Sequence, residues 1–332
     1  MTSSSVKATV VIPNWNGLRW LEGCLESLRD QDYRDFEVIL VDDASTDRSV
    51  EYVQEHYPEV HVIRRTEQGG FARTVNEGIR AASGEYVVLL NTDTLPDPSW
   101  LGELVRTMDR MPPGVGSLAS SMRQMDAPEL FDSAGDILTW YGQALKRGND
   151  KQVSGSDCSG EILAACAGAA LYRRDFLRAT GGFDEEFTSY LEDVDLGLRG
   201  RLLGYSSRFA QAAVVLHKGH GSALPNRTYV RLVTRNRLML LGKNIPLSLL
   251  VRHLPQLVLG QLVLFIQYRR PIASIHGYLS LVLEIPHVLR ARRRILAARV
   301  LSDHEIDSLL VSSPEGIALP RWLIRGAGRN VP

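Results

Sequence analysis

Short, wholly apolar segments alternate with helical patterns through the first hundred residues of the chain. Leucines at positions 18, 21, 25 and 28 have the spacing of one helical face, and residues 72–82 form another helical stretch. Strands this short, with helices between them, are typical of buried parallel strands in βαβ units. The sequence therefore predicts an α/β fold with a mostly parallel sheet flanked by helices. The four expected strands cover residues 8–12, 36–41, 60–63 and 86–90.

Distinctive polar residues follow three of these strands. In such sheets ligands bind outside the carboxyl ends of the strands, and right-handed crossovers bring those ends to one edge. We therefore expect a site at this edge. Two alternatives remain open, since Asp93 and Asp43 are also residue types that cap helices. The polar ends are Asn14-Trp15-Asn16, Asp42-Asp43 and Asn91-Thr92-Asp93.

Two further groups in the middle of the chain could carry chemistry. Glu192 and Asp193, with Asp195 close behind, are candidates for a general base, which must be a group held beside the reacting hydroxyl. They equally suit the first turn of a helix, where the macrodipole favours acids. His217 and His220 follow an apolar run, and a histidine there is either structural or part of the acidic edge.

Charge and cysteine usage exclude several classes. The 332 residues contain 38 basic and 38 acidic side chains, which argues against a nucleic-acid partner bound through bulk positive charge. Three cysteines cannot form a disulfide framework for this length and indicate a reducing compartment. The N-terminus lacks the pattern of a secretory signal. No P-loop and no dinucleotide-binding glycine pattern is present.

The C-terminal part of the chain is basic and rich in leucine. Residues 252–299 contain eight arginines and one acid, interleaved with apolar residues, as in helices that lie on an anionic membrane surface. The apolar stretch 254–268 is shorter than the roughly 20 residues that cross a bilayer. Prolines 255, 271 and 286 are expected to divide this region into separate helices. The alternative is a helical subdomain whose leucines pack on the main body or on a second subunit of a homo-oligomer.

Taken together and in this order, the motifs resemble a family 2 glycosyltransferase of the GT-A fold, and the basic tail resembles its rhamnosyltransferase-like branch. The resemblance implies a GT-A domain over residues 1–245 and a helical extension over 246–332. The nucleotide-binding half would cover about 1–112 and the acceptor half about 113–245. The motifs are VVIPNWNG (10–17), VDDASTD (41–47), GGFA (69–72) with Asn76, LLNTDT (89–94), GGFD (181–184) and YLEDVDL (190–196).

The resemblance also implies roles for individual residues. Asp193 matches the catalytic base, with Glu192 beside it. Asp93 matches the last acid of the metal-binding motif, where Asn91 replaces a second carboxylate, and His217 matches a histidine near the metal, which is Mg²⁺ or Mn²⁺. The implied donor-binding residues are Pro13 and Trp15 against the nucleobase, Asp43 bonded to the base, Asp42 shaping that pocket, and Asn91.

The implied function is an inverting, metal-dependent transfer of a sugar from a dTDP- or UDP-linked donor to a hydroxyl of a glycan or lipid-linked acceptor. Rhamnose is the favoured sugar, and synthesis of cell-surface polysaccharide at the cytoplasmic face of the membrane is the expected setting. Two alternatives are a non-catalytic nucleotide-sugar or glycan-binding module and a sugar-nucleotide pyrophosphorylase. A pyrophosphorylase would need a glycine-rich basic loop after the first strand, where this chain has Asn14-Trp15-Asn16-Gly17.

Overall fold

The computed structural model describes residues 6–156, 158–219 and 226–312, and the chain divides into two compact units. The first, which we call the sheet unit, contains Met1–Asp136, Lys146–Ala223 and Ala298–Val300. The second, the helical unit, contains Ile137–Leu145, Leu224–Ala297 and Leu301–Pro332.

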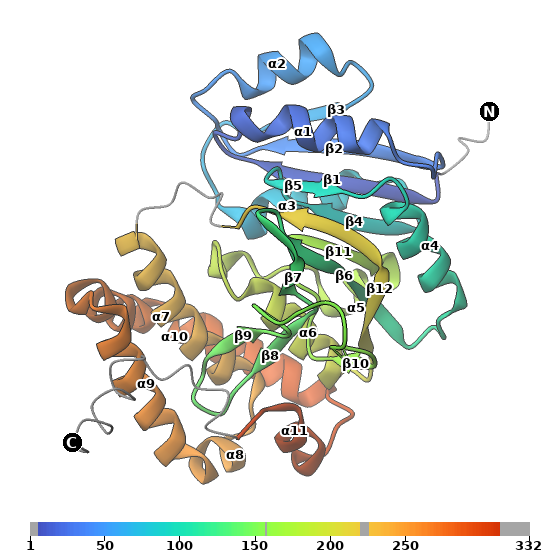
Figure 1. Ribbon diagram of the computed structural model, residues 1–332. Coiled ribbons are helices and arrows are strands. Elements are labelled where there is room, and N and C mark those ends of the chain that lie inside the picture. Colours follow the sequence, from blue (N-terminus) through green and yellow to red (C-terminus); the bar gives the residue numbers. More distant parts are fainter. Residues whose placement is uncertain (1–5, 157, 220–225, 313–332) are drawn as a thin grey trace, which may run out of the picture. The chain divides into compact units, whose positions relative to one another are not determined.

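The amino-terminal half of the sheet unit has the alternating order that the sequence predicts (Figure 1). Its four strands lie in the order β3-β2-β1-β4, and all three of their pairings are parallel. The carboxyl ends of these strands therefore meet at one edge, as expected. The elements are β1 (Ala8–Asn14), α1 (Leu18–Arg29), β2 (Phe36–Asp42), α2 (Ser49–His56), β3 (His61–Arg64), α3 (Phe71–Ala81) and β4 (Tyr86–Leu90).

The remainder of the sheet unit continues the sheet through β4-β11-β6-β12-β10. Strand β11 is antiparallel to both of its neighbours, so the sheet is mixed. Parallel pairing, predicted for most of the sheet, is found in the first half and between β6 and β12. The apolar run that forms β11 contains no signal for strand direction. These elements are β5 (Thr94–Pro96), α4 (Trp100–Arg110), β6 (Val115–Gln124), β7 (Ala127–Ser133), β10 (Glu161–Ile162), β11 (Ala169–Arg173), α5 (Arg174–Thr180), η1 (Glu185–Phe187), α6 (Glu192–Leu202) and β12 (Ser206–His217).

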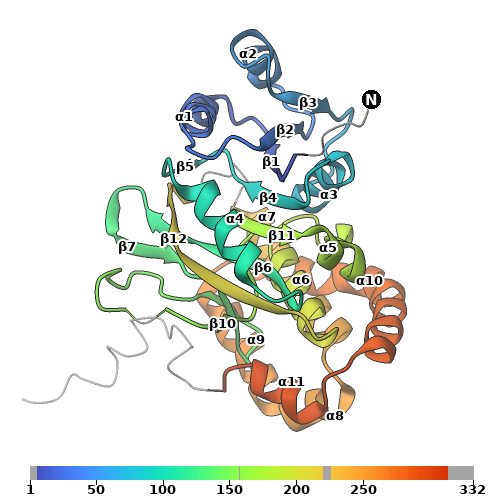
Figure 2. The ribbon, with the colours of Figure 1, turned by 90° about the vertical axis from the view of Figure 1, so that its right-hand side faces the viewer.

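Helices cover both faces of this sheet, as Figure 2 shows. Successive strand residues point to opposite faces, so Val10 packs with the core on the side of α1 and α4, and Val11 packs with the core on the side of α3 and α5. Trp100 and Tyr172 are the largest side chains of the two cores, and both are fully buried. The α/β class and the helix-flanked sheet are thus confirmed.

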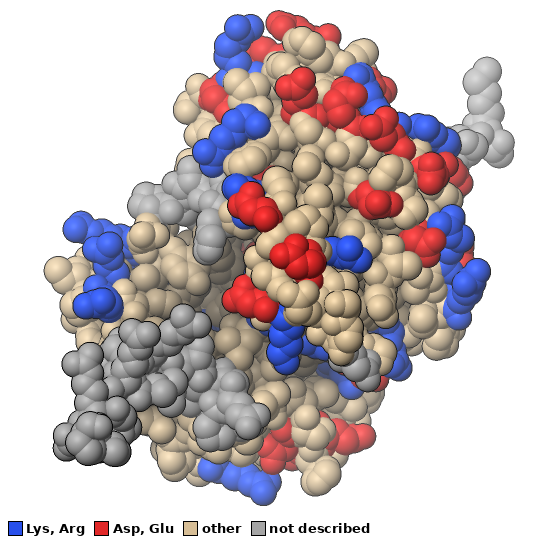
Figure 3. Space-filling view, viewed as in Figure 1, with Lys and Arg blue, Asp and Glu red and all other residues tan. Residues whose placement is uncertain are grey.

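Charged side chains of both signs lie side by side on the face of the sheet unit seen in Figure 3. Ion pairs link segments of this unit, such as the pair of Arg29 in α1 with Glu59 in the loop before β3, at 2.7 Å. Because such exposed pairs are screened by solvent, they contribute little to stability. The three cysteines of the chain are free thiols.

The helical unit is held by contacts among its own segments. Trp140 stacks on His253, with ring centroids 3.8 Å apart, and a side chain at Gly260 would collide with the backbone of Tyr141. Arg292 donates hydrogen bonds to the carbonyl oxygens of Gly242 and Ile245. Its helices are α7 (Asn226–Asn244), α8 (Leu247–Arg252), α9 (Leu254–Tyr268), α10 (Pro271–Ala298) and α11 (Asp303–Leu309), and the short strands β8 (Asp136–Leu138) and β9 (Ala144–Lys146) join the units.

One expectation for this part of the chain stays a prediction, and one changes. Helix α7 belongs to the helical unit by its contacts, and the domain boundary at residue 245 stays a prediction. Pro286 lies inside α10 and does not end it, because buried residues on either side of it anchor the helix. Pro255 and Pro271 do lie in the first turns of α9 and α10, where the missing N–H costs nothing.

By length and apolar composition alone, α10 is the one helix among the described residues that could cross a membrane. Helix α9 has 15 residues and is shorter than a span requires.

Candidate active site

A left-handed turn places the acidic residues at the start of α6. Thr188, Tyr190 and Leu191 have φ values of 64°, 73° and 70°, a region that L-residues other than Asn and Asp rarely adopt. Such conformations occur mainly at functional sites, where the surrounding structure holds them. The turn leads directly into Glu192 and Asp193 in the first turn of the helix.

Hydrogen bonds link Asp193 to the carboxyl end of β4 through two intervening residues. Its Oδ2 accepts a hydrogen bond of 3.1 Å from the backbone N–H of Ala167. The next residue, Gly168, accepts a bond of 2.9 Å from the N–H of Asn91 through its carbonyl oxygen. Ala167 and Gly168 are adjacent residues just before β11, and one contacts Asp193 while the other contacts Asn91. Asp193 and the Asn91–Asp93 segment therefore lie at the same edge of the sheet.

Buried at this edge, Asp93 faces His217. The carboxylate Oδ2 lies 3.5 Å from Nε2 of the imidazole, and Nδ1 of the same ring lies 2.9 Å from Asp132. Lys146 donates to both oxygens of Asp132, at 2.9 and 2.8 Å. Helix α4 begins after Ser99, so Asp93 is not its cap.

The charged side chains around Asp93 shift the pKa values of their neighbours. Burial lowers the pKa of His217, but hydrogen bonds and charge from Asp132 and Asp93 more than offset it and raise the pKa to about 9. Burial raises the pKa of Asp132, but His217 and Lys146 more than offset it and lower the pKa to about 2.

Asp93 and His217 have the chemistry of ligands for a divalent cation. A carboxylate oxygen suits Mg²⁺ or Mn²⁺, and imidazole nitrogen is acceptable to Mn²⁺. Asp132 holds Nδ1 of His217, so Nε2 is directed to Asp93, the arrangement in which a second carboxylate orients a metal-binding histidine. The residues present therefore fit the implied ion, which Nε2 of His217 would bind after losing its proton. His220 lies outside the described residues.

Asp42, the first of the two acids at the end of β2, is hydrogen-bonded to other residues of the protein. Asp42 is fully buried and accepts hydrogen bonds from Nδ2 of Asn14 at 2.8 Å and from the backbone N–H of Ser45 at 3.0 Å. These bonds join the ends of β1 and β2 and fix the loop between β2 and α2. A role of Asp42 in shaping a donor pocket stays a prediction.

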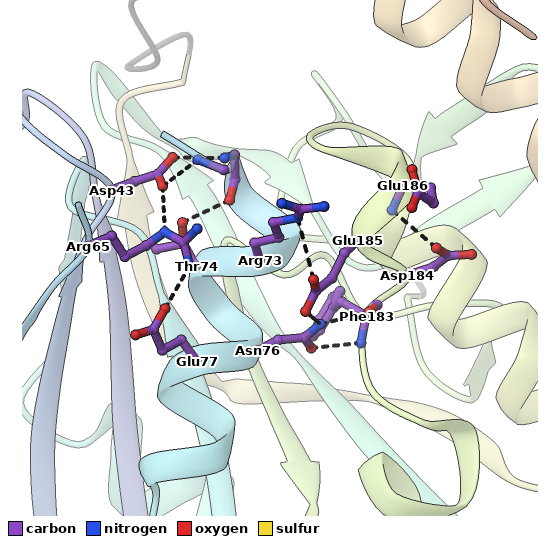
Figure 4. Close-up of polar contacts among 12 residues, drawn as sticks. Asp43, Arg65, Arg73, Thr74, Asn76, Glu77, Phe183, Asp184, Glu185 and Glu186 are labelled. Atoms are coloured by element: carbon purple, nitrogen blue, oxygen red, sulfur yellow. Dashed lines mark hydrogen bonds and ion pairs between the residues drawn. The ribbon is translucent and has the colours of Figure 1, made fainter. Parts of the chain in front are cut away.

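Asp43 is held by the glycine turn before α3 (Figure 4). One of its oxygens accepts from the N–H of Gly69 and from Nε of Arg65, and the other accepts from the N–H of Gly70. Arg65 also bonds Glu77 of α3, at 2.6 Å. The capping alternative for Asp43 is wrong, because α2 begins after Arg48. A contact between Asp43 and a nucleobase stays a prediction.

The other three predicted donor-binding residues lie at the strand ends with part of their surface exposed. Pro13 lies near the end of β1, Trp15 directly follows β1, and Asn91 directly follows β4. Their contacts with a donor stay predictions.

A second contact joins α3 to the segment before α6 (Figure 4). The Asn76 side chain donates to the carbonyl of Phe183 at 2.8 Å and accepts from its N–H at 3.0 Å. Gly70 has a φ of 82°, and a Cβ there would lie 2.5 Å from the side chain of Thr188. The glycine motifs therefore hold the left-handed turn before α6 against the start of α3.

Four residues at this edge escaped the sequence analysis. Asp136 and Cys166 have ligand atoms that lie, with one of Asp193, within 4.8 Å of one another. Asp132 and Lys146 come from β7 and β9, short strands in an irregular region where no periodic pattern singles them out.

The acids around Asp193 differ in role. Glu192 is 6% exposed, and burial together with the charge of Asp193 raises its pKa well above the usual value. Asp195 forms a buried ion pair with Arg199 at 2.8 Å, which is structural. Burial also raises the pKa of Asp193, while the N–H groups of Ala167 and Val194 act against that shift.

This chain is similar to a known protein family and to several known proteins. Residues 9–181 match the family model described as "Glycosyl transferase family 2". An N-acetylglucosaminyl-diphospho-decaprenol L-rhamnosyltransferase of Mycobacterium tuberculosis is 29% identical over 236 residues, which cover 61% of this chain and 73% of that protein. Glycosyltransferase GlyG of Streptococcus pneumoniae is 37% identical over 90 residues, 26% of this chain. The match spans 30% of the length of GlyG.

Solved structures share the fold. TarS 1-349 of S. aureus in complex with UDP-GlcNAc has a TM-score of 0.52 at 18% identity and covers 92% of this chain and 84% of its own. GalNAc-T7 with UDP, GalNAc and Mn²⁺ has a TM-score of 0.56 at 17% identity, covering 73% of this chain and 51% of that one.

Proposed function

This chain belongs to glycosyl transferase family 2, and we propose on that basis that it moves a sugar from a nucleotide-sugar donor to a hydroxyl group of a glycan or lipid-linked acceptor. The observation that carries the proposal is the pair of contacts at Ala167 and Gly168, which bring Asp193 and the Asn91–Asp93 segment to one edge of the sheet. A transferase of this kind needs a base for the acceptor and a diphosphate site for the donor next to each other.

The side chains divide the chemistry between them. A cation held by Asp93 and His217 would supply positive charge where the sugar–phosphate bond breaks. Asp193 accepts the proton of the attacking hydroxyl, and its raised pKa makes it a stronger base than an ordinary aspartate. A single displacement of this type inverts the configuration of the anomeric carbon. Lys146 and Asp132 keep His217 directed to Asp93.

Rhamnose is our proposal for the transferred sugar. Its support is the mycobacterial relative, whose name describes an L-rhamnosyltransferase that acts on a diphospho-decaprenol-linked sugar. A lipid-linked acceptor follows from the same comparison. A dTDP-linked donor and a place in the synthesis of a cell-surface polysaccharide are proposed from the resemblance to the rhamnosyltransferase-like branch.

A donor screen tests the proposal directly. With Mn²⁺ or Mg²⁺ present, dTDP-rhamnose should raise the thermal midpoint more than UDP- or GDP-linked sugars, because a ligand at 100 times its Kd adds about 2.7 kcal/mol to stability. Incubation with the stabilising donor and an acceptor should release a nucleoside diphosphate. Release of pyrophosphate would identify a pyrophosphorylase, and binding without turnover would identify a binding module.

We also propose that the helical unit contacts the cytoplasmic face of a membrane without crossing it. Many large apolar side chains of α9 and α10 are exposed, among them Val258 and Leu262 on α9 and Leu279 and Leu283 on α10. Arg290, near the end of α10, is exposed as well. Apolar side chains followed by arginines suit the boundary between acyl chains and anionic headgroups.

Vesicle binding tests this contact. Replacement of the exposed Arg290, Arg293 and Arg294 by Gln should weaken co-sedimentation with phosphatidylserine-containing vesicles about 10²-fold, because each arginine contributes about 1 kcal/mol at the surface. The matched control replaces three exposed arginines of the sheet unit, at positions 48, 64 and 178, and should bind as the wild type does. Equal loss in both triple variants, or protein that resists alkaline extraction, would contradict peripheral binding through α10.

A further inference from the structure

Asp136 is a buried carboxyl group that no motif predicted. It ends the first segment of the sheet unit, and its backbone N–H donates to the carbonyl oxygen of Ala164 at 2.9 Å. The residue is 6% exposed, and its buried Oδ2 has no hydrogen-bond partner among the described residues. An ionised oxygen in that position would lose its hydration without compensation, which is costly.

Asp136 faces the proposed base. One atom each of Asp136, Cys166 and Asp193 lies within 4.8 Å of the other two. Two carboxylates this close repel each other when both are ionised, so the second proton is released only at high pH. The thiol of Cys166 is neutral, because burial and the nearby carboxyls raise its pKa well above the usual value.

The charged groups around the pair favour one negative charge over two. Lys146 is the cation whose charge acts on both carboxyls, but its ammonium group is bonded to Asp132. The other titratable groups that act on the pair are Asp132 itself, Glu192 of α6 and Tyr172 of β11, none of which is a cation.

On the basis of the proposed transferase function, we propose that Asp136 and Asp193 share one proton at neutral pH and that Asp136 is a positioning residue, the protonated member that leaves Asp193 as the single ionised carboxylate. Burial and the charge of Asp193 raise the pKa of Asp136 well above its ordinary value, in agreement with this assignment. In its neutral form this carboxyl group resembles an amide and adds no second negative charge beside Asp193.

With one proton on the carboxyl pair at the start, every proton and electron pair of the transfer is accounted for. The acceptor hydroxyl gives its proton to Asp193 while its oxygen forms a bond to the anomeric carbon. The bond from that carbon to the diphosphate breaks, and its electrons remain on the leaving nucleoside diphosphate. The carboxyl pair then holds two protons and no charge, and it returns one of them to water before the next turnover.

Carbon-13 NMR of protein labelled at aspartate carboxyl groups tests the shared proton without any substrate. The wild type should show a carboxyl signal that titrates above neutral pH, far from the ordinary value of about 3.9. That signal should disappear in Asp136→Asn and remain in Cys166→Ala, the matched control for a change in the same cluster. If Asp136→Asn does not fold, the wild-type titration still decides. Ionisation of every aspartate below neutral pH would overturn the proposal.

Kinetics test the positioning role. Asp136→Asn imitates the neutral acid, so kcat with the donor identified by the screen should stay within about tenfold of wild type, and Asp136→Ala should lose more. The wild-type kcat/KM should fall at alkaline pH as the second proton leaves, and this fall should be absent in Asp136→Asn. An unchanged pH profile would show that Asp136 is only structural. If no donor is turned over, the transferase proposal fails while the NMR result still stands.

Discussion

Replacing Asp193 by Asn will lower kcat by about 10²–10⁴-fold and leave donor binding intact, because an amide cannot accept the proton of the acceptor hydroxyl. The side chain keeps its size and can still accept the N–H of Ala167, so the turn before α6 should be preserved. The measurement is turnover of the donor from the screen, together with calorimetric binding of that donor to the variant.

The matched control is Asp175→Asn, which removes a carboxylate with 84% of its side chain exposed on α5. It should turn over at the wild-type rate. Near-full activity of Asp193→Asn would rule out Asp193 as the base, and Glu192 would then be the next residue to test. Loss of donor binding in the variant would instead indicate a structural defect.

The sequence predicted the edge of the sheet at which these residues lie, because the rule for parallel strands needs only the order of elements. Asn14 and Asp42 end β1 and β2, and Asp93 follows β4, all strands whose apolar runs are unmistakable. The same rule applied to β3 would have found Arg65, which follows that strand and bonds Asp43. Arg65 was missed because arginine is not a residue type usually associated with a binding site at the end of a strand.

Other parts of the site could not be predicted from local pattern. Asp136 and Lys146 flank a segment that packs in the helical unit, and the strands that hold them are three residues long. Their approach to Asp193 depends on β11, which enters the sheet antiparallel between β4 and β6. Strand direction and long-range pairing are set by tertiary packing, which neither hydrophobic periodicity nor residue spacing encodes.

Replacing Asp93 by Ala will abolish the dependence of nucleotide binding on a divalent cation. The variant removes the carboxylate that faces Nε2 of His217, so a cation would keep one nitrogen ligand and no protein carboxylate from this motif. Metal stabilisation of a leaving diphosphate is worth several kcal/mol, so kcat should fall by at least about 10²-fold.

Calorimetry separates this effect from a general loss of fold. In the wild type, Mn²⁺ should tighten binding of the nucleoside diphosphate product, and in Asp93→Ala the affinity with Mn²⁺ should equal the affinity without it. Asp126→Ala removes an exposed carboxylate that pairs with Lys218 and should keep the full effect of Mn²⁺. If Mn²⁺ still tightens binding in Asp93→Ala, the cation is held elsewhere, and the cluster of Asp136, Cys166 and Asp193 would be the first place to look.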